Sequence, residues 1–207
     1  MRPLTLFHSP RTRSTGVLIL LEELGLPYTL EILDQRRGQQ LDPAYRAVNP
    51  MGKVPALKDG NAVVTEQVAI FLHLADLAPD QALAPPPGDP LRGPYLRWMV
   101  FYAAAFEPAL VDHAAKREPV RRGMSPYGDY ETVIEAVAGM LRPGPWVLGD
   151  RFSAADLLWG IALGWTMRFG MVPGRPEFRA LTDRVNARPA VQAARAKDEA
   201  LHAALPG

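Results

Sequence analysis

One proline-containing segment constrains the fold of this chain more than any other. Residues 49–57 read Asn-Pro-Met-Gly-Lys-Val-Pro-Ala-Leu, and Thr65-Glu66-Gln67 begins eight residues later. Because proline has no N–H to donate to a sheet, Pro55 belongs at a turn or at the first position of a strand. The order therefore indicates a loop that ends at Val54-Pro55 and leads into a short apolar strand.

The Val54-Pro55 step also predicts a local geometry. X-Pro bonds are cis in only about 5–6% of folded cases, and Asn-Pro occurs in ordinary loops too. The order of elements around this step favours a binding segment over an ordinary loop. With a cis bond here, the N–H and C=O of Val54 turn outward as a strand edge for an extended peptide, while Glu66 heads the next helix.

The first 78 residues predict a small α/β unit. Residues 4–7 have the pattern of a buried strand, and apolar residues then recur at helical spacing up to Gly25, a typical helix stop. Residues 28–33 predict a second strand, so strand, helix and strand imply a right-handed parallel crossover. A hairpin at Asp59-Gly60 and a helix over residues 66–78 complete the unit.

A proline-rich segment divides the chain. Residues 79–90 contain five prolines and one glycine, which is typical of an ordered interdomain linker. Everything after it has helical periodicity, in five segments: residues 91–113, 129–141, 153–165, 177–187 and 189–201. We therefore predict an α/β domain over residues 1–78, a linker over residues 79–90 and an all-α domain over residues 91–207.

Composition excludes several classes of function. The 207 residues include no cysteine, which excludes disulfides, protein thiolate nucleophiles, zinc-thiolate sites and CxxC redox pairs. The 23 basic and 22 acidic residues give a formal charge of +1, so nothing indicates nucleic-acid or membrane-surface binding. The four histidines lack metal-ligand spacing. With no apolar leader or spanning segment, we expect a cytoplasmic protein with a small ligand and no metal.

Three motifs carry a resemblance to a known family: residues 49–57, residues 65–70 and residues 148–156, which read Leu-Gly-Asp-Arg-Phe-Ser-Ala-Ala-Asp. In the third, we expect Ser153 to cap a helix and Asp156 to reach back to the Ser153 N–H, a folding role. With these motifs the chain resembles, nearly end to end, the cytosolic glutathione S-transferase superfamily, in a bacterial serine- or cysteine-like class. The resemblance implies a thioredoxin-like domain that holds glutathione, an all-helical domain that helps to form the electrophile pocket, and a homodimer.

The implied reaction is attack of the glutathione thiolate on an electrophilic carbon. A thiol with a pKa near 8.5 needs its pKa lowered by about two units, or about 2.7 kcal/mol, to be mostly ionised at neutral pH. We expect this from the free N–H groups and dipole of the first helix and from one loop hydroxyl. Alignment with the family makes Ser14 the first candidate and Thr12 the second, with a plain N-cap as the alternative for Ser14. Arg11 and Arg13 either add positive potential at the glutathione site or are solvated loop cations.

The resemblance also assigns residues to glutathione itself. Glu66, near a helix start, suits the γ-glutamyl ammonium group. Gln67 stands where the family usually has serine, and its amide can still donate to the γ-glutamyl carboxylate. Lys53 and Gln40 are candidates for the glycine carboxylate, with surface residues as the alternative. Val54, before Pro55, is expected to bind by its backbone alone.

The second substrate is less constrained by the sequence. Tyr102 and Phe106 lie mid-helix near where the family places its hydrophobic pocket, although most aromatic residues of this helix are expected to be core. The leading function is transfer of glutathione to small hydrophobic electrophiles. The alternatives are glutathione-dependent dehalogenation or ether cleavage, and a non-catalytic glutathione-binding module.

Overall fold

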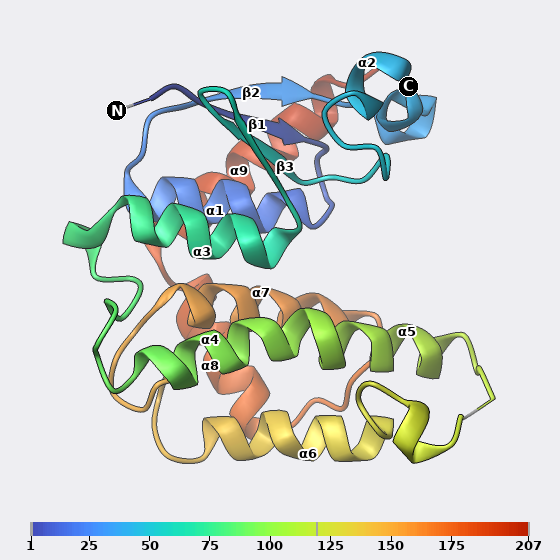
Figure 1. The fold of residues 1–207 in the computed structure, drawn as a ribbon, viewed down its shortest axis with the longest axis vertical. Helices are drawn as coiled ribbons and strands as arrows, with labels where there is room; N and C mark the ends of the chain where they lie inside the picture. Colours follow the sequence, from blue (N-terminus) through green and yellow to red (C-terminus); the bar gives the residue numbers. More distant parts are fainter. Residues whose placement is uncertain (1, 119, 207) are drawn as a thin grey trace. The chain divides into compact units, whose positions relative to one another are not determined.

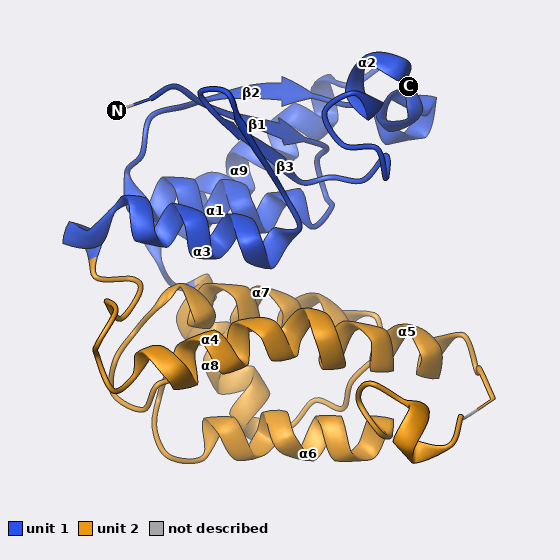
Figure 2. Cartoon of the chain, viewed as in Figure 1, with its two compact units in different colours: residues 1–81, 187–207 blue, residues 82–186 orange. Residues whose placement is uncertain are grey.

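A computed structural model describes residues 2–118 and 120–206 and divides the chain into two compact units (Figure 2). Unit 1 consists of Met1–Gln81 and Ala187–Gly207, and unit 2 of Ala82–Asn186. The first boundary lies inside the proline-rich segment, where the sequence predicts a linker. The second boundary differs from the prediction, because residues 187–207 group with the N-terminal unit.

Unit 1 contains a four-stranded sheet with the order β2-β1-β3-β4. β1 and β2 are parallel, with Leu6 opposite Leu30, whereas β3 runs antiparallel to both β1 and β4. The parallel crossover and the hairpin that the sequence predicts are both present. The strands and first helices are β1 (Leu4–His8), α1 (Ser14–Leu24), β2 (Tyr28–Ile32), α2 (Pro43–Arg46), β3 (Ala56–Asp59), β4 (Ala62–Thr65) and α3 (Gln67–Leu77), with short 3-10 turns at Gln35–Arg37, Gln39–Leu41 and Pro79–Gln81.

Helix α1 lies at the centre of unit 1. Its residues 17–21 are fully buried, and it contacts β1, α3 and α9, with α1 and α3 side by side in Figure 1. The helix ends at Gly25, whose φ of 62° lets the next N–H, of Leu26, bond back to the Leu21 C=O at 3.2 Å. This left-handed stop is the one that a glycine permits at low cost.

The last helix, α9 (Pro189–Ala204), packs on unit 1 instead of completing the helical domain. Its buried positions are Val191, Ala194 and Asp198, a spacing that places them on one face of the helix. At its start, the Arg188 guanidinium contacts the Glu23 carboxylate on α1, with Nε 3.0 Å from both oxygens. The predicted domain boundary is therefore wrong for this helix, because its contacts of high sequence separation are invisible to local periodicity.

Unit 2 is all-helical, as predicted, and its core surrounds Trp159. The predicted helix over residues 91–113 is observed with a π-helical turn in its middle, followed by Pro108, which lacks the N–H for a regular helical bond. Gly160 lets two helices approach closely, since a Cβ there would lie 2.5 Å from Val185 Cγ2. The elements are α4 (Arg92–Phe101), the π-turn Tyr102–Phe106, α5 (Glu107–Ala114), the 3-10 turn Arg122–Met124, α6 (Tyr130–Leu141), α7 (Ala154–Arg168) and α8 (Pro176–Asn186).

The described part of the chain has no helix of the length and apolar character needed to cross a membrane. Within the same residues, no group of three or more histidine, aspartate and glutamate side chains is arranged to hold a metal ion.

Candidate active site

The loop between β1 and α1, residues 9–13, carries the predicted hydroxyl groups. Ser14, the first residue of α1, is fully buried. Its Oγ accepts from the Ser9 N–H at 3.1 Å and lies 2.8 Å from His8 Nδ1, 2.9 Å from the Ser9 C=O and 2.8 Å from Thr12 Oγ1. Ser14 is therefore enclosed by protein partners, and it is not the N-cap, because Arg13 occupies that position.

Thr12 is more accessible than Ser14. Its side chain is half-buried, and its Oγ1 donates to the Ser9 C=O at 2.7 Å while accepting from the Ser14 N–H at 3.2 Å. The Thr12 hydroxyl thus supports the start of α1 from its solvent side. Of the two predicted catalytic hydroxyls, it is the one that a ligand can approach without displacing buried groups.

The first N–H groups of α1 are not free, in contrast to the expectation for an anion-binding helix start. The Ser14 N–H bonds to Thr12 Oγ1, the Thr15 N–H to the Thr12 C=O at 3.1 Å, and the Gly16 N–H to the Arg13 C=O at 3.1 Å. The tight turn at Thr12 and Arg13 therefore consumes these donors. The helix dipole still favours an anion here, and no acidic residue lies in the first turn.

A buried carboxylate from α9 meets this loop. Asp198 Oδ1 accepts from Thr15 Oγ1 at 2.7 Å and lies 3.0 Å from His8 Nε2, close but bent away from ideal hydrogen-bond geometry. Oδ2 accepts from the Arg11 N–H at 3.0 Å. Burial favours a raised pKa, yet the contacts with His8, Thr15 and Arg11 outweigh it and lower the pKa of Asp198. Asp198 is therefore a carboxylate held inside unit 1.

Sequence reasoning missed Asp198, although the sequence contains a signal for it. Val191, Ala194 and Asp198 follow the spacing of one helical face, so an acidic residue stands in an otherwise apolar stripe. A charged side chain at such a position needs a buried partner. Identifying the partner requires the fold, because His8 lies 190 positions earlier in the sequence.

Arg11 and Arg13 have different surroundings, although both side chains are exposed. Arg11 has a φ of 59°, a left-handed conformation that is uncommon for a non-glycine residue, and its Nε donates to both oxygens of Glu199 at 3.1 Å. The Arg13 C=O accepts from Gln67 Nε2 at 3.2 Å. The backbone of Arg13 is therefore where the loop meets the start of α3.

The start of α3 contains the two predicted γ-glutamyl contacts. Glu66 is exposed and has a φ of 66°, a strained conformation that costs about 1–3 kcal/mol. Gln67 turns its amide toward α1, and a Cβ on Gly16 would lie 2.5 Å from Gln67 Nε2. Gln67 Oε1 is buried without a hydrogen-bond partner among the described residues. A glycine at position 16 and a glutamine at position 67 thus fit each other.

The Val54-Pro55 peptide bond is cis, so the predicted geometry of this step is confirmed. The preceding carbonyl, that of Lys53, accepts from the Tyr45 hydroxyl at 2.5 Å and from Asn49 Nδ2 at 2.7 Å. The N–H and C=O of Val54 take part in none of the hydrogen bonds found among residues 2–118 and 120–206. The loop is held through the Lys53 carbonyl, and contact of the Val54 backbone with a ligand stays a prediction.

Gln40 and Lys53 are brought close through their backbones. Gly52 has a φ of 60°, and a Cβ there would lie 3.0 Å from the Gln40 C=O, so only a glycine fits without a shift. The Lys53 side chain is exposed. Gln40 is half-buried, and its Oε1 has no hydrogen-bond partner among the described residues.

The predicted electrophile-pocket residues lie in the core of unit 2. Tyr102 and Phe106 are 2% and 0% exposed, and their rings pack on Trp159 with centroids 5.6 and 4.9 Å away. The Tyr102 hydroxyl donates to Glu107 Oε1 at 2.9 Å. Packing is the role that these contacts support, and contact with a substrate stays a prediction.

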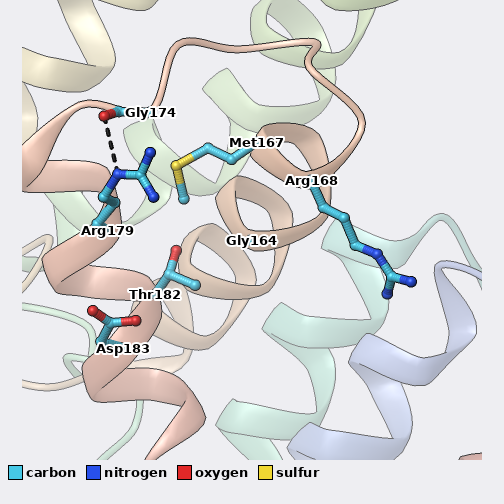
Figure 3. Close-up of a pocket in the computed structure, with 7 residues that line it drawn as sticks. All are labelled: Gly164, Met167, Arg168, Gly174, Arg179, Thr182 and Asp183. Carbon is cyan, nitrogen blue, oxygen red and sulfur yellow. Dashed lines mark hydrogen bonds between the residues drawn. The ribbon is translucent and has the colours of Figure 1, made fainter.

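A cavity of about 300 Å³ in unit 2 is lined by none of the predicted site residues. Figure 3 shows it between the end of α7 and the first turns of α8, with the Arg179 Nε donating to the Gly174 C=O at 3.1 Å. Its lining residues are Gly164, Met167, Arg168, Gly174, Arg179, Thr182 and Asp183.

Comparisons with known proteins agree on one family. The profile described as "Glutathione S-transferase, N-terminal domain" matches residues 12–77. Glutathione S-transferase GstA of Escherichia coli O157:H7 is 30% identical over 190 residues, covering 90% of this chain and 94% of the relative.

Solved structures give the same result. The glutathione transferase of Methylococcus capsulatus is 32% identical, with a TM-score of 0.79 over 95% of this chain and 99% of that one. A glutathione transferase homologue from Sulfitobacter with bound glutathione is 30% identical, with a TM-score of 0.74 over 95% of this chain and 99% of that one.

Proposed function

The chain belongs to the glutathione S-transferase family and is a glutathione transferase, and from this premise we propose that its second substrate is a small hydrophobic electrophile. The glutathione sulfur attacks an electrophilic carbon of that substrate, forming a thioether as the leaving group departs. Since the chain has no cysteine, glutathione supplies the sulfur nucleophile of the reaction.

The observation that carries this proposal is the hydrogen bond of 3.2 Å from Gln67 Nε2 to the Arg13 C=O. It joins the loop that carries the hydroxyl groups to the start of α3 within unit 1. A tripeptide whose γ-glutamyl end lies at Glu66 therefore has its sulfur within reach of the β1–α1 loop. This geometry supports thiol activation by residues 12–14.

Within this site, Thr12 is the proposed donor to the thiolate and Ser14 its support. To stabilise the thiolate, a hydroxyl must turn its single hydrogen toward the sulfur. Thr12 does so by giving up its hydrogen bond to the Ser9 C=O. Ser14 is fully buried with partners on every side. Hydrogen bonding to the charged form of the thiol lowers its pKa, which is the enzyme's main contribution to this reaction.

The remaining glutathione contacts follow from the same arrangement. Glu66 pairs with the γ-glutamyl ammonium group, and the backbone of Val54, beside Pro55, pairs with the peptide. Lys53 and Gln40, whose backbones lie close through Gly52, bind the glycine carboxylate. Arg13 is exposed beside the loop, where its charge favours an anionic sulfur.

Three finer points belong to the same proposal. The hydrophobic second substrate contacts Tyr102 or Phe106 only if unit 2 rearranges, since both rings are now packed. Dehalogenation or ether cleavage would use the same thiolate with a different acceptor. A homodimer in the cytoplasm completes the proposed state of the enzyme.

Retention on immobilised glutathione tests the first half of the proposal. An ultraviolet difference spectrum at pH 7 then tests whether the bound sulfur is a thiolate, and turnover of activated aryl chlorides, alkyl halides and aryl ethers identifies the acceptor. Retention without a thiolate signal would favour a non-catalytic module. Turnover of alkyl halides or ethers alone would replace the proposed acceptor class by one of the alternatives.

A further inference from the structure

The buried Asp198 carboxylate has no role in the reaction as described so far, yet it contacts one residue of the β1–α1 loop and one residue in each of the two elements that flank the loop. It accepts from the Arg11 N–H at 3.0 Å and the Thr15 hydroxyl at 2.7 Å, and it lies 3.0 Å from His8 Nε2. His8 in turn lies 2.8 Å from Ser14 Oγ. All of these residues belong to unit 1.

We propose that Asp198 is a positioning residue for thiol activation: through His8 and Arg11 it fixes the hydroxyl loop so that Thr12 is left to donate to the glutathione sulfur. The inference rests on the proposed function. It adds to that function a residue on the last helix, far from the loop in sequence.

The first step of the argument concerns the backbone. Arg11 has a φ of 59°, and a non-glycine residue keeps such a conformation only where its surroundings over-determine it. Here the Arg11 N–H is held by Asp198 and the guanidinium by Glu199. Helix α9 therefore holds the loop in a shape that the loop would not keep by itself.

The second step concerns the direction of each hydrogen. In the neutral His8 ring, the Asp198 carboxylate 3.0 Å from Nε2 favours the tautomer protonated there, and Nδ1 is then the acceptor. Ser14 has two buried acceptors for its only hydrogen, His8 Nδ1 and the Ser9 C=O, and Thr15 donates its own hydrogen to Asp198. Thr12 donates to the same Ser9 C=O, which Ser14 can also satisfy, so the Thr12 hydrogen can turn to a ligand without leaving that carbonyl unpaired.

The acid, histidine and serine that lie in contact here do not form a hydrolytic triad. Asp198, His8 and Ser14 are 3%, 0% and 0% exposed, so no substrate carbonyl can reach Ser14 Oγ. The serine hydrogen points into the protein and is not available for a reaction with solvent or substrate. Orientation of the loop is the role that remains for the three residues.

The charged surroundings of Asp198 are limited to a few groups. His8 and Arg11 face it from the loop, and Arg195 lies near it on its own helix, where the charge of Asp198 acts to raise the pKa of Arg195 against the effect of burial. Glu199 turns outward to Arg11. Replacing Asp198 by asparagine removes the one buried negative charge of this group.

A matched control exists in the same unit. Asp59 is also buried, at 2% exposure, and also lies 3.0 Å from a histidine Nε2, that of His73. Its other partner is Arg2, at 2.7 Å. In these contacts Asp59 meets no residue of the β1–α1 loop, so Asp59→Asn repeats the chemical change without affecting the loop.

The experiment compares the full chain with Asp198→Asn and Asp59→Asn. For Asp198→Asn we expect kcat with an activated aryl chloride to fall about tenfold, with KM for glutathione changed less than about threefold. The pKa of the bound glutathione thiol, from ultraviolet titration, should rise by about one pH unit. Asp59→Asn should leave kcat and the thiol pKa at their original values.

Two further measurements separate the inference from the proposed function. Amide hydrogen exchange over residues 9–17 should accelerate in Asp198→Asn and not in Asp59→Asn, whether or not the chain turns over any electrophile. If Asp198→Asn does not fold, Thr15→Val removes one donor to the carboxylate and should give a smaller change in the same direction. Equal exchange, kcat and thiol pKa in the two folded aspartate variants would overturn the inference, whereas absence of glutathione binding in the original chain would overturn the proposed function.

Discussion

The starts of helices α7 and α1 both contain a buried serine, and they differ in where its partners come from. Before α7, Ser153 forms a capping box with Asp156, whose Oδ2 accepts from the Ser153 N–H at 2.7 Å and from the Ser153 hydroxyl at 2.9 Å. At the first residue of α1, Ser14 contacts the nearby Ser9 and Thr12, and also His8 and, beyond it, Asp198 of α9. The carboxylate that supports Ser153 lies three residues away, whereas the carboxylate that supports Ser14 through His8 lies on a distant helix.

This difference separates a helix start that stabilises the fold from one that we propose takes part in the reaction. At α7 the serine and its carboxylate partner lie in the same helix start, and the first helical N–H, that of Ala154, bonds to the Leu83 C=O at 2.8 Å, which suits residues that stabilise a helix. At α1 the N-cap is Arg13, without a side-chain cap, and the loop before it contains a left-handed arginine. Strain and long-range support of this kind are characteristic of sites that bind or react.

The largest expected effect is a loss of stability when the capping box at the start of α7 is removed. Asp156 accepts from the Val147 N–H at 2.6 Å as well as from Ser153, so Asp156→Ala leaves several buried donors without a partner. We expect the free energy of unfolding to fall by about 3 kcal/mol, measured by urea denaturation. Asp150→Ala, an exposed position in the same motif, should cost at most about 0.5 kcal/mol. Equal losses in the two variants would show that the capping box does not stabilise unit 2.

The pH dependence of stability tests the same carboxyl group. Burial raises the pKa of Asp156 to about 6, against hydrogen bonds from Val147 and Ser153. A folded pKa above the unfolded value means that the protonated form is preferred on folding, so this group's contribution is greatest below pH 4 and is lost as the pH rises through 6. Relative to Asp156→Asn, the original chain should lose about 2–3 kcal/mol of unfolding free energy between pH 4 and pH 7. A constant difference between the two proteins would contradict the raised pKa.

At the start of α1, removing each of the two hydroxyl groups in turn sharpens the comparison. Thr12→Val keeps the shape of the side chain and removes its donor, so we expect kcat/KM to fall about tenfold, or about 1.4 kcal/mol. The unfolding free energy should fall by about 1 kcal/mol, because the Ser14 N–H loses its acceptor. Ser14→Ala should lower the unfolding free energy by about 1–3 kcal/mol, because His8 and the Ser9 N–H lose a buried partner. Steady-state kinetics and urea denaturation give the two quantities. A larger loss of kcat in folded Ser14→Ala than in Thr12→Val would make Ser14 the activating group.

The smallest expected effect concerns Gln67. Gln67→Ser removes the bond to the Arg13 C=O and the buried Oε1 without a partner, and it leaves a hydroxyl beside the helix start for the γ-glutamyl carboxylate. We expect KM for glutathione to fall about two- to threefold, since one weak internal bond is exchanged for one to the ligand. Gln67→Ala, which offers no hydroxyl, serves as the control and should not lower KM. A higher KM in the serine variant would assign the glutamine itself to glutathione binding.

Much of the fold could be predicted because its signals are local. The capping box of Ser153 and Asp156, the hairpin at Asp59-Gly60 and the helix stop at Gly25 each depend on residues a few positions apart. In these three cases the residue types permit few conformations, so the local sequence is sufficient. The cis bond before Pro55 was expected from the order of the elements around it, because proline permits a cis bond without requiring one.

The rest depends on contacts between distant residues. The helix of residues 189–204 was expected in the helical domain, because periodicity gives a helix and its apolar face but not the surface on which it packs. The contact between His8 and Asp198 was missed for the same reason. The N–H groups of α1 are occupied by the turn at Thr12 and Arg13, a local contact that the residue pattern did not indicate. The residues of the candidate site could therefore be proposed from the sequence, whereas the arrangement that favours Thr12 over Ser14 as the proposed donor needed the fold.

The packing of α9 on unit 1 also affects the order in which the enzyme can form. A ribosome makes β1 and its loop first and α9 after all of unit 2, so the emerging chain holds the loop without the carboxylate that fixes it. If Asp198 positions the loop as proposed, the nascent N-terminal unit acquires its reactive geometry only when residues 187–204 arrive. Activation of the thiol then waits for the synthesis of α9.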